Sequence, residues 1–142
     1  METILKLNKW ANAHTNFGFD ALRVLLGAFL FYKGMWLFSD ANSKETFKML
    51  ETLPGMFGNL FLIHYIAMAH IFGGVLIAIG LFTRVSVLVQ LPIVMAAVIV
   101  NLMGEMNVAN LLQASLCLLA CAFFLFYGSG RNSVDHSLRM HI

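Results

Sequence analysis

The fold is decided by residues 59–103, which read NLFLIHYIAMAHIFGGVLIAIGLF at 59–82, TR at 83–84 and VSVLVQLPIVMAAVIVNLM at 85–103. A helix needs about 20 mainly apolar residues to cross the hydrocarbon core of a bilayer. Both apolar runs are long enough, and only Thr83 and Arg84 separate them. The sequence therefore predicts two antiparallel membrane-spanning helices that are direct neighbours, joined by a very tight turn.

Two further runs of this kind, at 17–38 and 108–127, flank the central pair. Of the 142 residues, 60% are hydrophobic and 11% are charged, whereas soluble domains carry about a quarter charged residues. Apolar helices can also be the buried helices of a large soluble protein, but a chain this short has no such core. We expect a single all-α domain over 1–142, a transmembrane four-helix bundle whose outer surface faces membrane lipid.

Basic residues indicate the orientation, because cytoplasmic loops of membrane proteins carry an excess of Lys and Arg. The excess lies on the side that holds both termini, which predicts both in the cytoplasm. Residues 3–11 and 43–53 each place apolar side chains on one helical face, and we interpret both as short amphipathic helices on the membrane surface. Soluble loops of ordinary apolar content are the alternative.

Small residues mark the faces on which the helices approach each other, because helices in lipid associate through close backbone contact and polar contacts. Gly27 and Gly34 share one face of the first helix. On the second helix the pairs with this spacing are Ala69 with Gly73 and Gly74 with Ala78.

Polar and ionisable residues inside the membrane are costly and usually face inward, so they are the candidates for function. All four helices supply such residues, and most fall at one level, in the outer half of the bilayer. This coincidence predicts a polar pocket or network opening toward the outside. The ligand-binding candidates are Lys33, His64, His70, Asn101, Glu105, Asn110 and Gln113.

Lys33 lies among aromatic residues, deep enough that its ammonium group must reach the interface or meet an anion. It either forms a structural ion pair, with Glu105 or Asp40, or anchors an anionic or carbonyl-bearing ligand. His64 and His70 are six residues apart and point about 120° from each other. They either join helices by hydrogen bonds, transfer protons, contact a quinone-like carbonyl or ligate a metal or haem with other helices.

The remaining polar residues favour structural roles. Asp20 and Arg23 are three residues apart and can pair on one helix face, with Gln90 at a similar depth. Cys117 and Cys121 are interpreted as small buried hydrophobic residues. The sequence contains no nucleotide motif, metal-binding cluster, nucleophile–base pair or nucleic-acid-binding pattern. Catalytic residues therefore stay unknown, no metal is expected, and an autonomous enzyme is disfavoured.

Three stretches carry a resemblance to a known family. They are RVLLGAFLFYKG at 23–34, HIFGGVLIAIGLFTR at 70–84 and YGSGRNSVDH at 127–136. In this order they resemble the DoxX/DoxD family of small bacterial and archaeal membrane proteins. The resemblance implies a four-helix transmembrane bundle in the bacterial inner membrane. It also implies association with redox assemblies, since the family name comes from subunits of a terminal quinol oxidase and a thiosulfate:quinone oxidoreductase.

Two functions compete on these observations. The first is a redox-linked accessory subunit that binds a quinone or similar lipid-soluble molecule in the outer-half pocket, where Lys33, His64 and Glu105 would converge. The second is a non-enzymatic scaffold or assembly factor, with or without homo-oligomers, whose polar groups only fasten the helices and leave no void. A proton-linked carrier is disfavoured, because neither a discontinuous helix nor an inverted repeat is present.

Overall fold

The computed structural model describes residues 17–39, 44, 48, 60–103, 107–129 and 133–137. These residues form four long helices, α2 (Phe17–Leu37), α4 (Leu60–Ile79), α5 (Thr83–Met103) and α6 (Val108–Tyr127), and one short helix, α7 (Val134–Ser137). The described part of the chain has no strand, so the predicted all-α helical bundle is confirmed. Of the predicted surface helices, 3–11 lies outside the described residues, and in 43–53 only Lys44 and Lys48 are described, both as helical.

The helices are those of a multi-pass membrane protein. Three of them, α4, α5 and α6, are long and apolar enough to cross a bilayer. α2 has 21 residues and carries Asp20, Arg23 and Lys33, so its place as the fourth span stays a prediction. Large apolar side chains point outward on every long helix, among them Leu25 at 65%, Leu119 at 67% and Phe126 at 65% exposure. Such a surface is suited to lipid rather than water.

The turn between the second and third long helices differs from the prediction. α4 ends at Ile79 and α5 begins at Thr83, so Gly80, Leu81 and Phe82 make the turn, while Thr83 and Arg84 belong to α5. Gly80 and Phe82 have φ angles of 73° and 49°, a left-handed conformation that few residues other than glycine adopt readily. The turn is as tight as expected but lies three residues earlier, because backbone geometry rather than hydropathy ends α4.

α2 and α4 pack with their backbones in contact, as the small residues predict. A Cβ atom added to Gly27 would lie 2.5 Å from the carbonyl oxygen of Gly74 and 2.6 Å from the amide nitrogen of Ala78. One added to Gly34 would lie 2.8 Å from the carbonyl oxygen of Ala67. Glycine is therefore required at both positions for the two helices to approach this closely.

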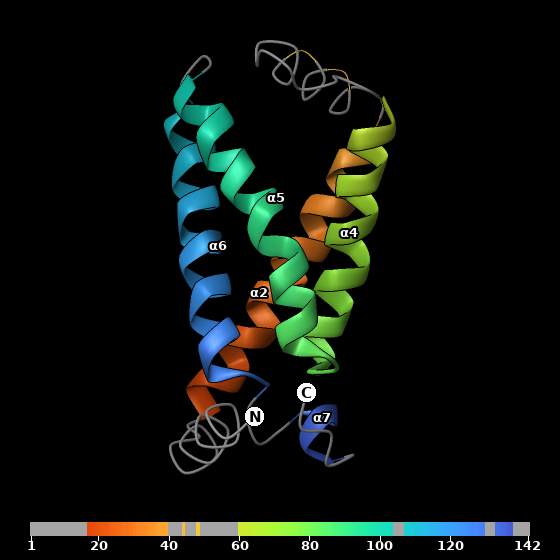
Figure 1. Ribbon diagram of the computed structural model, residues 1–142, viewed down its shortest axis with the longest axis vertical. Coiled ribbons are helices and arrows are strands. Elements are labelled where there is room, and N and C mark those ends of the chain that lie inside the picture. The colour runs from red at the N-terminus through yellow and green to blue at the C-terminus, as the bar shows by residue number, and fades with distance from the viewer. Residues whose placement is uncertain are drawn as a thin grey trace.

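The four helices meet at one end of the bundle and separate toward the other (Figure 1). The end at which α7 lies is called here the α7 end, and the opposite end, at Leu37, Leu60, Met103 and Val108, the pocket end. At the α7 end α5 starts beside α4, and toward the pocket end it runs with α6 away from α2 and α4. A buried apolar cluster near the α7 end, which includes Leu26, Ile77, Val87, Cys121 and Phe124, joins all four.

Candidate functional site

A pocket of about 440 Å³ lies between the α2–α4 pair and the α5–α6 pair, and all four long helices line it. Most of its wall is apolar, with the aromatic side chains of Phe29, Trp36 and Tyr65 among the lining residues. Small-molecule sites in proteins typically have this size and character, with a few convergent polar groups that fix the ligand's orientation.

Five of the seven predicted ligand-binding candidates line this pocket: Lys33 from α2, His70 from α4, Asn101 from α5, and Asn110 and Gln113 from α6. The structure thus brings together polar groups from four helices, although the residue from α4 is His70, which the depth argument placed nearer the middle of the membrane, and not His64. The aromatic wall was anticipated only in general terms. Its individual members could not be chosen from so many aromatic residues without knowing the rotation of each helix.

The other two candidates are placed differently. His64 is exposed and is not among the lining residues, and its ring meets the Phe38 ring edge-on, with centroids 5.9 Å apart. Of the two histidines, which point about 120° apart on one helix, His70 lines the pocket and His64 does not. The expected convergence of Lys33 with His64 is therefore not seen. Glu105 lies outside the described residues.

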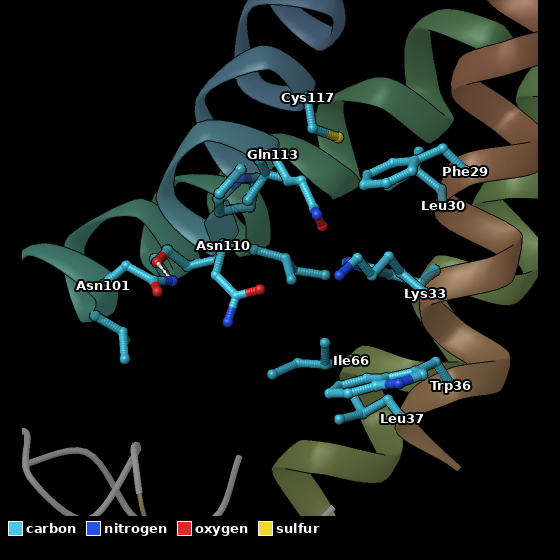
Figure 2. Close-up of a pocket in the computed structure, with 18 of the residues that line it drawn as sticks. Phe29, Leu30, Lys33, Trp36, Leu37, Ile66, Asn101, Asn110, Gln113 and Cys117 are labelled. Atoms are coloured by element: carbon cyan, nitrogen blue, oxygen red, sulfur yellow. Dashed lines mark hydrogen bonds between the residues drawn. The ribbon is translucent and has the colours of Figure 1, made fainter. Parts of the chain in front are cut away.

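Lys33 crosses from α2 into the pocket and points toward Asn110 and Gln113 on α6 (Figure 2). Its Nζ lies 5.8 Å from the centre of the Phe29 ring and 5.4 Å from that of Trp36. An ammonium group at such distances is attracted by the ring faces, and more strongly where water is excluded. No Asp or Glu is among the described residues that line the pocket, where Nζ lies beside these two rings.

The side-chain amide of Asn101 has a fixed orientation. Its Nδ2 donates to the carbonyl oxygen of Ala97, 2.8 Å away, one turn earlier in α5. Because a carbonyl can only accept, the amide orientation is determined, and Oδ1 is left as the unengaged atom. Oδ1 is buried and has no hydrogen-bond partner among the described residues. Asn101 as a whole is 8% exposed and lines the pocket.

Gln90 holds α5 to α4 near the middle of the bundle. Its Nε2 donates to the carbonyl oxygen of Ala69 at 2.6 Å, and the residue is fully buried. Gly73, one turn further along α4, leaves room for this amide, since a Cβ there would collide with Nε2 of Gln90. The structural role expected for Gln90 agrees with this geometry.

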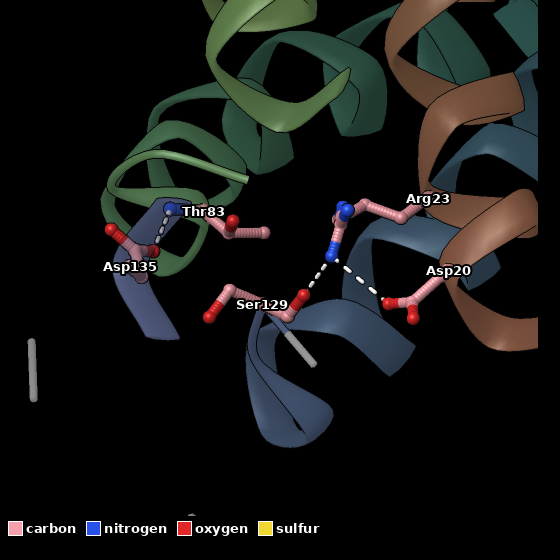
Figure 3. Close-up of polar contacts among 5 residues, drawn as sticks. All are labelled: Asp20, Arg23, Thr83, Ser129 and Asp135. Carbon is pink, nitrogen blue, oxygen red and sulfur yellow. Dashed lines mark hydrogen bonds and ion pairs between the residues drawn. The ribbon is translucent and has the colours of Figure 1, made fainter. Parts of the chain in front are cut away.

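Asp20 and Arg23, at the α7 end, are engaged with each other. Arg23 pairs with Asp20 at 3.1 Å, and its guanidinium also donates to the carbonyl oxygen of Ser129, just beyond α6 (Figure 3). The side chains of Asp20 and Arg23 are only 11% and 3% exposed. The contact joins α2 to the segment that follows α6, and this favours a structural role for both residues.

Asp135 was not singled out as a candidate, yet it organises the α4–α5 turn. Its carboxylate accepts from the backbone amides of Phe82 at 2.9 Å and Thr83 at 3.3 Å, at the start of α5. Its own amide donates to the carbonyl oxygen of Gly80 at 3.1 Å. Carboxylates are favourable at helix N-termini, where amides lack partners. The only sequence feature that pointed to Asp135 was the Ser-x-Asp pattern in the closing segment. No pattern in the neighbouring sequence links this residue to a turn some 50 residues earlier.

Neither cysteine is in a disulfide. Cys117 and Cys121 are buried free thiols, and Cys117 also lines the pocket. Among the described residues, no three His, Cys, Asp or Glu side chains are grouped so as to hold a metal ion. The described residues that line the pocket offer one cation, three amides, one imidazole, the thiol of Cys117 and aromatic rings, among them the phenol of Tyr65 and the indole of Trp36.

Comparison with known proteins gives one match. Residues 18–104 match the family described as DoxX. The matched region is more than half of the chain and contains nearly all of α2 and the whole of α4 and α5. No curated protein and no solved structure matches.

Proposed function

The chain belongs to the DoxX family of membrane proteins, and we propose that it binds a lipid-soluble molecule with a quinone-like, oxygen-bearing head in the pocket between its two helix pairs. The bound molecule serves a redox assembly of which this protein is an accessory subunit rather than the catalyst. The single observation that carries the proposal is the pocket itself: about 440 Å³, with an apolar wall and polar groups from four helices.

The lining residues fit such a head group. Lys33 and the amides of Asn110 and Gln113 can donate to a ligand oxygen from opposite walls of the pocket. Trp36, Phe29 and Tyr65 offer ring faces and edges for an aromatic head. Because the pocket lies between helices whose outer surfaces are apolar, a hydrophobic tail can extend along the aliphatic part of the wall.

The cation of the pocket is not paired as a charged group that fastens helices would be. At the α7 end Asp20 and Arg23 pair with each other, and Asp135 accepts from backbone amides. Lys33, by contrast, has no Asp or Glu among the described residues that line the pocket. Ionisable residues inside a membrane are costly and often mark a site for a ligand.

Trp36 makes the proposal testable, because quinones quench tryptophan fluorescence on contact. The chain has two tryptophans, so a Trp10→Phe protein reports on Trp36 alone. We expect decyl-benzoquinone to quench this emission saturably in detergent or nanodiscs. Lys33→Met should weaken the binding by about tenfold, in line with a lost charge-assisted hydrogen bond. Lys48→Met, which removes an exposed lysine, should leave it unchanged.

A matched pair of histidines sharpens the test. His70→Ala removes a lining residue and should change the affinity, whereas His64→Ala, six residues away on the same helix, should not. Non-saturable quenching that is equal in all variants would mean partition into detergent or lipid and would refute the site. Thermal unfolding of each variant in the same detergent shows that a loss of binding is not a loss of fold.

A further inference from the structure

We propose that the pocket also binds the anion of a single-chain carboxylic acid, a long-chain fatty acid, with its carboxylate between Lys33 and the amides of Asn110 and Gln113. The inference concerns the same pocket but goes beyond the proposed function, because it needs neither a ring nor a redox assembly. It follows from the charge of the cavity, the direction in which Lys33 points and the exposure of the residues at the cavity wall.

The wall of the cavity carries a positive charge. Lys33 is the only Lys, Arg, Asp or Glu among the described residues that line it. The ring centres of Phe29 and Trp36, 5.8 Å and 5.4 Å from Nζ, attract the ammonium group but do not neutralise it. A charge in apolar surroundings is costly unless an opposite charge meets it. A ligand with a negative head therefore gains more in this pocket than a neutral one of the same shape.

The polar side chains around the cation can bind both oxygens of a carboxylate. Lys33 extends from α2 toward Asn110 and Gln113 on the opposite wall (Figure 2). Its ammonium group has three donors and no acceptor, and each side-chain amide can turn two N–H donors toward a ligand. An ionised carboxylate only accepts, and such charge-assisted hydrogen bonds are strong. One oxygen can thus accept from Lys33 while the other accepts from an amide on α6.

The remainder of the pocket suits one alkyl chain that enters from the membrane. Its lining is mainly apolar, with aliphatic side chains such as Ile66 and Ile93. Tyr65 of α4 and Val89 of α5 also line it and are 56% and 43% exposed, so the wall of the cavity is continuous with the lipid-facing surface of these two helices. A phospholipid would have to bring two chains and a substituted phosphate between the helices, which favours the single-chain acid.

Energy transfer from tryptophan tests the proposal. Dansylamino-undecanoate, a fatty acid with a fluorophore at the end of its chain, accepts energy from tryptophan. In the Trp10→Phe protein the donor is Trp36, since the chain has two tryptophans. The protein is placed in phosphatidylcholine vesicles, and the methyl ester of the probe is the control for partition into lipid. We expect saturable transfer with the acid, at a concentration at least about tenfold lower than with the ester, the gain from hydrogen bonds between charged groups. Dodecanoate should displace the probe at least about tenfold more effectively than dodecanol.

Variants assign the preference to its residue. Lys33→Met and Lys33→Gln, which remove the charge in an apolar and a polar way, should both abolish the preference for the acid over the ester. Lys33→Arg should retain most of it, and Lys48→Met, at an exposed lysine, should retain all of it. Thermal unfolding of each variant in the same vesicles shows that the fold is kept.

Three results would overturn the inference. They are equal binding of acid and ester in the parent protein, a preference for the acid that survives in Lys33→Met and Lys33→Gln, and displacement of the probe by phosphatidylglycerol as effective as that by dodecanoate. The last result would assign the pocket to anionic phospholipids instead. The titration with decyl-benzoquinone is independent of these measurements, so a failure of the proposed function is recognised separately.

Discussion

The two ends of the bundle use polar residues in different ways. At the α7 end, Asp20, Arg23 and Asp135 are buried and bonded to each other or to backbone groups of neighbouring elements. At the pocket end, Lys33 lies against aromatic rings, and the Oδ1 of Asn101 has no partner among the described residues. Hydroxyl groups near the α7 end, those of Thr83, Ser86 and Tyr127, also lack a partner among the described residues, so the contrast concerns the charged groups. They are paired or capped at the α7 end, whereas Lys33 lies beside a cavity at the other end.

This difference teaches that an intramembrane polar residue is not by itself a functional one. Placing a charged side chain in lipid costs free energy. At the α7 end a partner within the protein offsets this cost. Where the protein supplies no partner, the groups remain available for a ligand. Substitutions at the two ends should therefore separate stability from binding, and the following expectations run from the largest effect on stability to the smallest.

Arg23→Met should have the largest effect. It leaves the carboxylate of Asp20 buried beside Ser129 without its counter-charge, and breaking a buried ion pair in this way costs about 3–5 kcal/mol. The free energy of unfolding in mixed micelles measures the loss. Lys33→Met, which removes a cation from the same helix at the pocket end, should cost about 1 kcal/mol, the value of its ring contacts. Equal losses would contradict the distinction between the two ends.

Gly27→Ala should come next. The new Cβ would lie 2.5 Å from the carbonyl oxygen of Gly74, so α2 and α4 must move apart, and overpacking of this kind costs about 1–3 kcal/mol. Gly18→Ala is the matched control on the same helix, because nothing lies within 4 Å of a Cβ added there. It should be neutral or slightly stabilising, and a loss as large as that of Gly27→Ala would mean that the α2–α4 contact is not the cause.

Much of this architecture could be predicted from the sequence, because a bilayer demands long apolar runs. The length of the apolar run is enough to predict the bounds of α6. Helical periodicity is enough to predict that Gly27 and Gly34 share a contact face and that Asp20 can pair with Arg23. The α4–α5 turn could not be located in the same way. Its residues are as apolar as the helices, and its cap, Asp135, is contributed from some 50 residues away.

The sequence predicts that polar residues of several helices lie at a similar depth. It does not predict which side chains line the pocket. Hydropathy gives the depth of a residue and leaves open the rotation of its helix about its own axis. His64 and His70 show the consequence, since both were candidates and only His70 lines the pocket. The volume itself depends on the separation of α5 and α6 from α2 and α4, which no local pattern encodes.

Asp135→Ala should have an intermediate effect, about 1 kcal/mol, typical of losing a helix-capping side chain. The backbone amides of Phe82 and Thr83 would lose their acceptor, so hydrogen–deuterium exchange should rise at the start of α5. Asp135→Asn keeps an acceptor oxygen and should retain most of the stability. Ser137→Ala, at an exposed position of α7, is the control. Exchange that is unchanged in Asp135→Ala would show that the cap is dispensable.

The smallest effect on stability is expected from Asn101→Leu, and the comparison with Gln90→Leu makes it informative. Both amides are buried on one stripe of α5. Gln90 donates to Ala69 on another helix, so its loss should cost about 1–2 kcal/mol, as interhelical hydrogen bonds in membranes do.

Both amides leave their oxygen without a partner among the described residues, but the bond that Asn101 donates stays within its own helix. Its replacement by an apolar group of similar size should therefore be neutral or stabilising. Unfolding of the two variants in the same micelles measures the difference. A buried amide whose removal costs no stability is not needed to hold the helices together. If Asn101→Leu were as destabilising as Gln90→Leu, the pocket end would be held together by the same means as the α7 end, and the division between the two would fail.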